Sequence, residues 1–131
     1  MEKIKSTKDI ENMAIDYVVD YLKSRGERPK IVKSGIDIIS DNKYIEVKGC
    51  MKKETNLRIT QQTMDYLDKN NISDTFFIYH VFDMGKEPKL LIFDYETFQK
   101  EKKPETRWII QPNQIKEKPE LIPLKKIKFG S

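Results

Sequence analysis

Two carboxylates and a lysine lie close together in this sequence, on two predicted strands that meet at a turn. Asp37 belongs to the segment 36–39, and Glu46 belongs to the segment 44–47. Lys48 follows directly after the second segment. Both segments are rich in β-branched and aromatic residues, which favours strands. The Asp-Asn pair between them is typical of a tight turn. The sequence therefore predicts a β-hairpin that carries all three charged side chains.

The register of this hairpin decides the chemistry that the three side chains can do. A two-residue turn places Asp37 opposite Glu46, and opposed residues project from the same face of a sheet. Lys48 shares this face because strand side chains alternate with a period of two. Two adjacent carboxylates repel and are costly to desolvate, so we expect a cation between them. A salt-bridged hairpin without a site is the alternative to a magnesium or manganese site.

The opposite face of the hairpin is predicted to be buried. It carries four aliphatic residues: Ile36, Ile38, Ile45 and Val47. Ile39 and Tyr44 accompany the charged side chains on their own face, so we expect that face to be partly buried as well.

The residues Gly35-x-Asp37, followed by Ile45 to Gly49 (Ile-Glu-Val-Lys-Gly), resemble the motif of the PD-(D/E)XK nuclease superfamily. The sequence looks closest to the Mrr-like branch and to the C-terminal domain of NO VEIN proteins, over about residues 7–95. The resemblance implies an α/β fold of the restriction-endonuclease-like class. A central mixed β-sheet would be flanked by helices, with elements in the order αβββαββ.

The resemblance also implies roles for individual residues. The side chains of Asp37 and Glu46 and the backbone carbonyl of Val47 would hold Mg²⁺ or Mn²⁺. Lys48 would orient or help to deprotonate the attacking water. The implied reaction is the hydrolysis of phosphodiester bonds in DNA.

Two predicted helices flank the strands. The first begins at Ser6 or Thr7 and ends near Gly26, because apolar residues recur at helical spacing from Ile10 to Leu22. The second begins after Thr60, a good N-cap, and fades at Asn70-Asn71.

Residues on both helices match slots near the active site of the resembled family. The family often places an acidic residue on its first helix, and Glu11 matches that slot, although a solvated helix glutamate has the same sequence signal. Some relatives carry a polar residue at the start of the second helix. Gln61 or Gln62 can fill this auxiliary role, and their spacing does not choose between them.

Further strands are predicted at residues 28–33, 75–83 and 90–93, and residues 108–110 are predicted to form one more strand or a packing segment. The segment 75–83 is apolar on both faces, which is typical of a central strand covered on both sides. It contains His80, which we expect to be a core residue. Asp94 is placed to cap a short helix.

Basic residues follow the hairpin and fill the C-terminal part. Lys52 and Lys53 lie directly after the motif, where the resemblance places a loop near the DNA backbone. Residues 99–131 contain nine basic and four acidic residues. Lys125 and Lys126 are candidate contacts to DNA phosphates. A flexible loop and a solvated tail are the alternatives. We expect residues 1–103 to form the α/β domain and residues 104–131 to form a basic, proline-containing extension that packs on it.

The composition excludes several function classes. With one cysteine and one histidine in 131 residues, the chain can form neither an internal disulfide nor a Cys/His zinc site. It has no apolar run long enough for a membrane span and no signal peptide, so we expect a cytoplasmic protein.

The sequence supports two main functions. The first is a metal-dependent DNA nuclease, which the joint presence of Asp37, Glu46 and Lys48 favours. The alternative is a catalytically silent nuclease-fold module that binds DNA or protein. A structural partner that docks through its tail and a homodimer that presents one site to each DNA strand also stay open.

Overall fold

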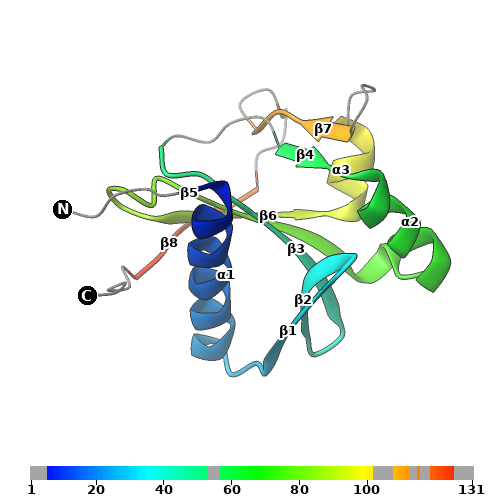
Figure 1. Cartoon of the computed structure of the whole chain (residues 1–131), viewed down its shortest axis with the longest axis horizontal. Helices are drawn as coiled ribbons and strands as arrows, with labels where there is room; N and C mark the ends of the chain where they lie inside the picture. The colour runs from blue at the N-terminus through cyan, green and yellow to red at the C-terminus, as the bar shows by residue number, and fades with distance from the viewer. Residues whose placement is uncertain (1–5, 53–56, 102–107, 113–114, 116–118, 126–131) are drawn as a thin grey trace.

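The computed structural model describes residues 6–52, 57–101, 108–112, 115 and 119–125 (Figure 1). Helices and strands follow one another along the chain in an α/β order. They are α1 (Thr7–Ser24), β1 (Pro29–Ser34), β2 (Ile36–Ser40), β3 (Lys43–Gly49), β4 (Leu57–Ile59), α2 (Gln61–Asn70), the 3-10 turn η1 (Ser73–Thr75), β5 (Phe76–Phe82), β6 (Lys89–Asp94), α3 (Tyr95–Glu101), β7 (Trp108–Ile110) and β8 (Leu121–Pro123). Within the described ranges, no helix is long and apolar enough to cross a membrane.

Six of the strands form one mixed sheet in the order β1-β2-β3-β5-β6-β8. The pair β3–β5 is parallel, and the other neighbouring pairs are antiparallel. The connection from β3 to β5 carries β4 and α2, as a parallel pair requires a crossover. β4 pairs with β7 in a second, two-stranded sheet.

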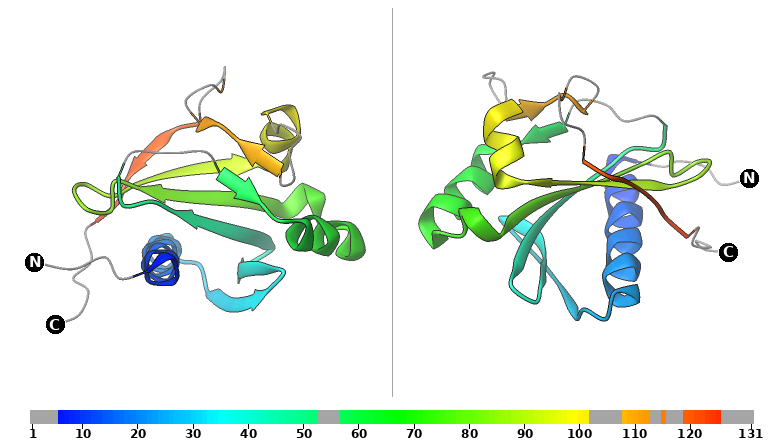
Figure 2. Two further views of the ribbon diagram at one scale, coloured as in Figure 1. Left: turned by 45° about the horizontal axis from the view of Figure 1, so that its top comes forward. Right: turned by 180° about the vertical axis from the view of Figure 1, so that it is seen from behind.

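Helices cover both faces of the large sheet. Figure 2 shows α1 on one face and α2, α3 and the small β4–β7 sheet on the other. Each face has its own apolar cluster, one built around Ala14, Val18 and Leu22 of α1 and the other around Leu67 of α2 and Phe98 of α3. The predicted fold class, a mixed sheet flanked by helices, is confirmed.

The helix boundaries agree with the capping signals. The Ser6 hydroxyl accepts a hydrogen bond from the Asp9 amide at 3.1 Å, at the start of α1. The Thr60 hydroxyl accepts one from the Thr63 amide at 3.3 Å, at the start of α2. α2 ends at Asn71, which has a left-handed conformation.

The predicted register of the hairpin is confirmed for the three pairs nearest the turn, and the ladder ends before the predicted pair Asp37–Glu46. Ile38 lies opposite Ile45, Ile39 opposite Tyr44 and Ser40 opposite Lys43. Asp41 takes the positive φ of 53° that the tight turn requires.

One part of the face assignment is wrong. Ile38, Ile45 and Val47 share one buried face, as expected, and pack in the cluster with α1, but Ile36 is buried in the cluster on the α2 side. A register shift between β1 and β2 comes just before it, and Gly35 has a positive φ of 84°. We attribute the misplaced Ile36 to these irregularities, because a bulge and a left-handed residue rotate the start of a strand.

His80 lies in β5, between β3 and β6, and is fully buried. Its Nδ1 lies 3.2 Å from the carbonyl oxygen of Lys48, and its ring stacks on Phe82. His80 is therefore a core residue, as expected, and it supports the strand that carries Lys48.

The C-terminal part contributes two strands. β7 was predicted at residues 108–110 and pairs with β4. β8 was not predicted, and it forms the edge of the large sheet by pairing with β6, where Leu90 lies opposite Ile122. β8 has only three residues and ends at Pro123, so it has no strand signal of its own, and only the pairing with β6 reveals it.

Gly35 joins the start of β2 to α2. A Cβ at this position would lie 2.4 Å from the ring of Tyr66, and the Gly35 carbonyl accepts a hydrogen bond from the Thr63 hydroxyl at 2.8 Å. Gly26 also has a positive φ, yet a Cβ there meets no atom within 4 Å.

Alanine substitutions at these two glycines distinguish the cost of backbone strain from the cost of a steric clash. We expect Gly26→Ala to cost about 1 kcal/mol of unfolding free energy, because alanine is strained at positive φ. Gly35→Ala should cost about 1–3 kcal/mol more, because the Tyr66 ring must also move. Denaturant unfolding of both variants measures the difference. Equal costs would contradict the close packing of α2 on β2.

Candidate functional site

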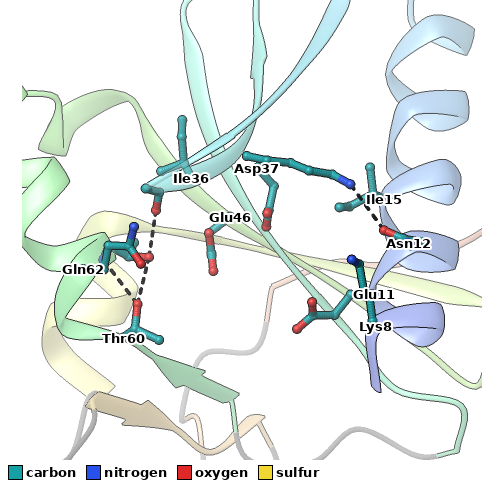
Figure 3. Close-up of a pocket in the computed structure, with 12 residues that line it drawn as sticks. Lys8, Glu11, Asn12, Ile15, Ile36, Asp37, Glu46, Thr60 and Gln62 are labelled. Carbon is teal, nitrogen blue, oxygen red and sulfur yellow. Dashed lines mark hydrogen bonds between the residues drawn. The ribbon is translucent and has the colours of Figure 1, made fainter. Parts of the chain in front are cut away.

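A cavity of about 300 Å³ lies between the N-terminal half of α1 and the start of α2, against β2 and β3 (Figure 3). Asp37 and Glu46 line it from the strands, Glu11 from α1 and Gln62 from α2. Figure 3 shows the carboxylates of Asp37 and Glu46 projecting side by side into this space, with that of Glu11 on the opposite wall. The fold thus brings together acidic residues that lie far apart in the sequence.

Asp37 and Glu46 have different surroundings. Glu46 is 8% exposed, and its Oε2 forms an ion pair with Lys48 Nζ at 3.2 Å. Asp37 is half-buried, and its Oδ2 accepts a hydrogen bond from the Val47 amide at 2.8 Å. The predicted grouping of these three charged side chains is present in the structure.

The pKa of Glu46 is raised to about 7, mainly because burial penalises the charged carboxylate. The neighbouring Asp37 carboxylate raises this pKa further, and Lys48 lowers it. A single ammonium group therefore does not offset burial and the second carboxylate together. The site has a deficit of positive charge.

The hydrogen bond from Val47 to Asp37 also locates a backbone oxygen. An extended residue directs its N–H and C=O toward the same neighbouring strand. The Val47 amide points to Asp37 on β2, so the Val47 carbonyl lies along the same edge of β3. The ladder between β2 and β3 is observed only as far as the pair Ile38–Ile45, so Val47 lies beyond its end.

These donors fit a hard divalent cation. Within the described ranges, no three Asp, Glu, His or Cys side chains form a group that could hold a metal. Two carboxylates and one carbonyl are nevertheless a donor set that suits Mg²⁺, which usually keeps several waters and takes only one or two carboxylates from the protein. The charge deficit at Glu46 favours a cation at this position.

A second cavity of about 190 Å³ adjoins this group of charges. Lys48 and Arg58 line it from β3 and β4, and Glu11 lines both cavities. We did not single out Arg58 from the sequence. Its signal is the alternation in β4, where the buried Leu57 and Ile59 leave the side chain between them on the exposed side.

The structure distinguishes the two candidate glutamines. Gln62 lines the first cavity, whereas the side-chain amide of Gln61 donates a hydrogen bond to Asp65 at 2.9 Å along the exposed surface of α2. Only Gln62 is therefore placed to take part in the site.

Two of the four predicted DNA-contacting lysines are described by the structure, and neither lies at the site. Lys52 and Lys125 are exposed, and neither lines either cavity. Lys53 and Lys126 lie outside the described residues. The sequence also missed Lys8, Asn12 and Lys33, which line the first cavity.

The sequence was also compared with known protein families, curated proteins and solved structures. Residues 10–93 match the family model described as "Protein NO VEIN, C-terminal". The chain belongs to this family. The match to the NO VEIN C-terminal family spans most of α1 and nearly all of β6, so it includes Asp37, Glu46, Lys48 and Arg58. No curated protein and no solved structure matches the chain.

The raised pKa of Glu46 predicts a pH-dependent effect of Glu46→Gln. A folded-state pKa near 7, above the ordinary value of 4.5, favours folding below pH 4.5 relative to higher pH, and this contribution is lost as the pH rises through 7. Glutamine carries no charge at any pH. We therefore expect the variant to gain stability over the wild type between pH 4.5 and 8, by roughly 3 kcal/mol at most.

Denaturant unfolding of both proteins in chelator, at several pH values, measures this gain. Gln61→Glu, which adds a carboxylate to the exposed surface beside the site, controls for general effects of charge. A stability difference between Glu46→Gln and wild type that is the same at pH 4.5 and pH 8 would contradict the raised pKa.

Proposed function

We propose that this NO VEIN C-terminal domain is a metal-dependent nuclease that hydrolyses phosphodiester bonds in DNA. The observation that carries the proposal is the contact between Asp37 and Glu46 inside a cavity, with Lys48 as the only cation paired to them among the described residues. The resemblance of residues 35–49 to the PD-(D/E)XK motif supports the same reading. Membership of the NO VEIN C-terminal family is compatible with a nuclease-like, DNA-related domain.

Asp37, Glu46 and the Val47 carbonyl would hold the metal, Mg²⁺ or Mn²⁺. When bound, the metal would polarise the phosphate and lower the pKa of a bound water. The hydrogen bond from the Val47 amide holds the Asp37 carboxylate in place beforehand. Such pre-orientation matters because metal sites depend on ligands fixed by their neighbours.

Lys48 would orient the attacking water and stabilise negative charge on the phosphate. Its ammonium group is held beside Glu46 at 3.2 Å, and its backbone carbonyl contacts His80 of the central strand. Glu11 faces the carboxylates from α1 and would orient a water from that side. Gln62 would contact the substrate from α2.

A second candidate function is a nuclease-fold module that binds DNA or protein without cutting it. Two observations favour it: the lack of a group of three acidic, His or Cys side chains within the described ranges, and a Glu46 carboxyl whose pKa near 7 leaves it partly protonated at neutral pH. A cleavage assay separates the two functions.

We expect the protein to cut DNA in Mg²⁺ or Mn²⁺ and not in chelator. Asp37→Ala, Glu46→Ala and Lys48→Ala should each lower the rate by about 10²-fold or more, as is typical for groups that activate or position a nucleophile. Glu11→Ala should lower it less. Single-stranded, duplex and branched DNA are the substrates to compare.

Matched variants control this assay. Gln62→Ala should slow cleavage, whereas Gln61→Ala, one residue away on the exposed surface, should not. Cleavage at the wild-type rate by any of the three strand variants would rule out this site. A folded wild type that cuts none of the substrates would favour the silent module.

Metal binding can be tested without a substrate. Asp37→Asn keeps the acceptor for the Val47 amide and removes one of the two charges. In chelator we expect it to be more stable than wild type by about 1 kcal/mol, because repulsion with Glu46 is relieved. Mg²⁺ or Mn²⁺ at ten times Kd should stabilise wild type by about 1.4 kcal/mol and leave the variant nearly unchanged.

Thermal melts of both proteins, with chelator and with excess metal, measure these shifts. If the variant is less stable in chelator and metal shifts neither protein, Asp37 is a structural hydrogen-bonding residue and the metal site is wrong.

A further inference from the structure

The second cavity lies directly beside the proposed catalytic carboxylates and carries a different charge. Among the described residues that line it, Lys48 and Arg58 are cationic and Glu11 is the one acidic residue. The first cavity, in contrast, contains Asp37 and Glu46. Lys48 touches Glu46 and also lines the second cavity, so it connects the two spaces.

Arg58 is the cation best placed to bind an anion in the second cavity. It lies on β4 between two buried residues, so its side chain is held on the exposed side of a paired strand. Within the described ranges, no carboxylate forms an ion pair with it. A guanidinium group presents a planar fork of donors that matches the oxygens of a phosphate.

Lys48 supplies the second positive charge only in part. Its ammonium group is already paired with Glu46, and Glu11 adds negative charge at the boundary of the two cavities. An anion in the second cavity therefore competes with Glu46 for Lys48. Any change that neutralises Glu46 should strengthen the binding of an anion.

We propose that the second cavity binds a phosphate of the DNA strand, next to the phosphate that Asp37 and Glu46 address, with Arg58 as the principal contact and Lys48 as a shared one. The inference rests on the proposed function for the identity of the strand. It adds a binding residue on β4, outside the hairpin, and a coupling between the two cavities. A strand held in this way passes Lys48 on its path from one cavity to the other.

The test is the binding of a fluorescein-labelled single-stranded DNA oligonucleotide, measured by anisotropy in chelator at several salt concentrations. Arg58→Gln should weaken binding about fivefold and lower the log–log salt slope by about 0.7, the value for one lost phosphate contact on a single strand. Arg58→Lys should keep the slope. Arg28→Gln, at an exposed arginine that lines neither cavity, should change nothing.

Glu46→Gln tests the coupling. It removes the partner of Lys48, so we expect it to bind the oligonucleotide more tightly than wild type in chelator, by about threefold. In the double variant Glu46→Gln, Arg58→Gln, the loss caused by the arginine change should remain. A structural role of Arg58 would not change the salt slope.

An unchanged salt slope in Arg58→Gln, or a wild type that does not bind the oligonucleotide even at low salt, would overturn the inference. Complete displacement of the oligonucleotide by low-millimolar inorganic phosphate would also overturn it, in favour of a site for free phosphate. Because the measurement needs neither metal nor cleavage, it is separate from the nuclease test. If binding depends on Arg58 but the protein never cuts DNA, the nuclease proposal is wrong and the phosphate-binding proposal stands.

Discussion

The candidate site is built around two carboxylates that are held side by side in a partly buried cavity although they repel each other. Two like charges about 5 Å apart repel by roughly 3 kcal/mol at an effective dielectric constant of 20. Burial of Glu46 adds to this cost and raises its pKa to about 7. The surrounding fold fixes the arrangement: Gly35 and Thr63 tie β2 to α2, and the Val47 amide holds Asp37. A stable fold that keeps such a pair is well prepared to receive a cation.

Lys48 couples the two cavities, because it is paired with Glu46 of the first and lines the second. Its ammonium group offsets part of the charge of Glu46. If a cation neutralises Glu46, the ammonium group of Lys48 becomes available to bind a phosphate. Conversely, a phosphate that binds Lys48 frees the Glu46 carboxylate to bind the cation. By thermodynamic linkage the two binding events then strengthen each other. His80 contributes from the core, where its ring contacts the backbone of Lys48.

Elements from both faces of the sheet meet at the site. α1 brings Glu11 to both cavities, α2 brings Gln62 to the first, and β4 brings Arg58 to the second. The match to the NO VEIN C-terminal family includes most of α1 and all of α2 and β4, and it ends before α3. β7 and β8 lie beyond it and complete the two sheets by pairing with β4 and β6.

The sequence by itself determined the features that depend on neighbours along the chain. The cap at Thr60, a cap at Ser6 or Thr7, the register of the hairpin near its turn and the shared face of its charges follow from local hydrogen bonds and the period of a strand. Only the tertiary structure decided which side chains enter the cavities: Gln62 rather than Gln61, and Arg58 of β4. It also placed Ile36 on the α2 side and added β8 to the sheet. These outcomes depend on contacts between segments distant in the chain, which a local pattern does not contain.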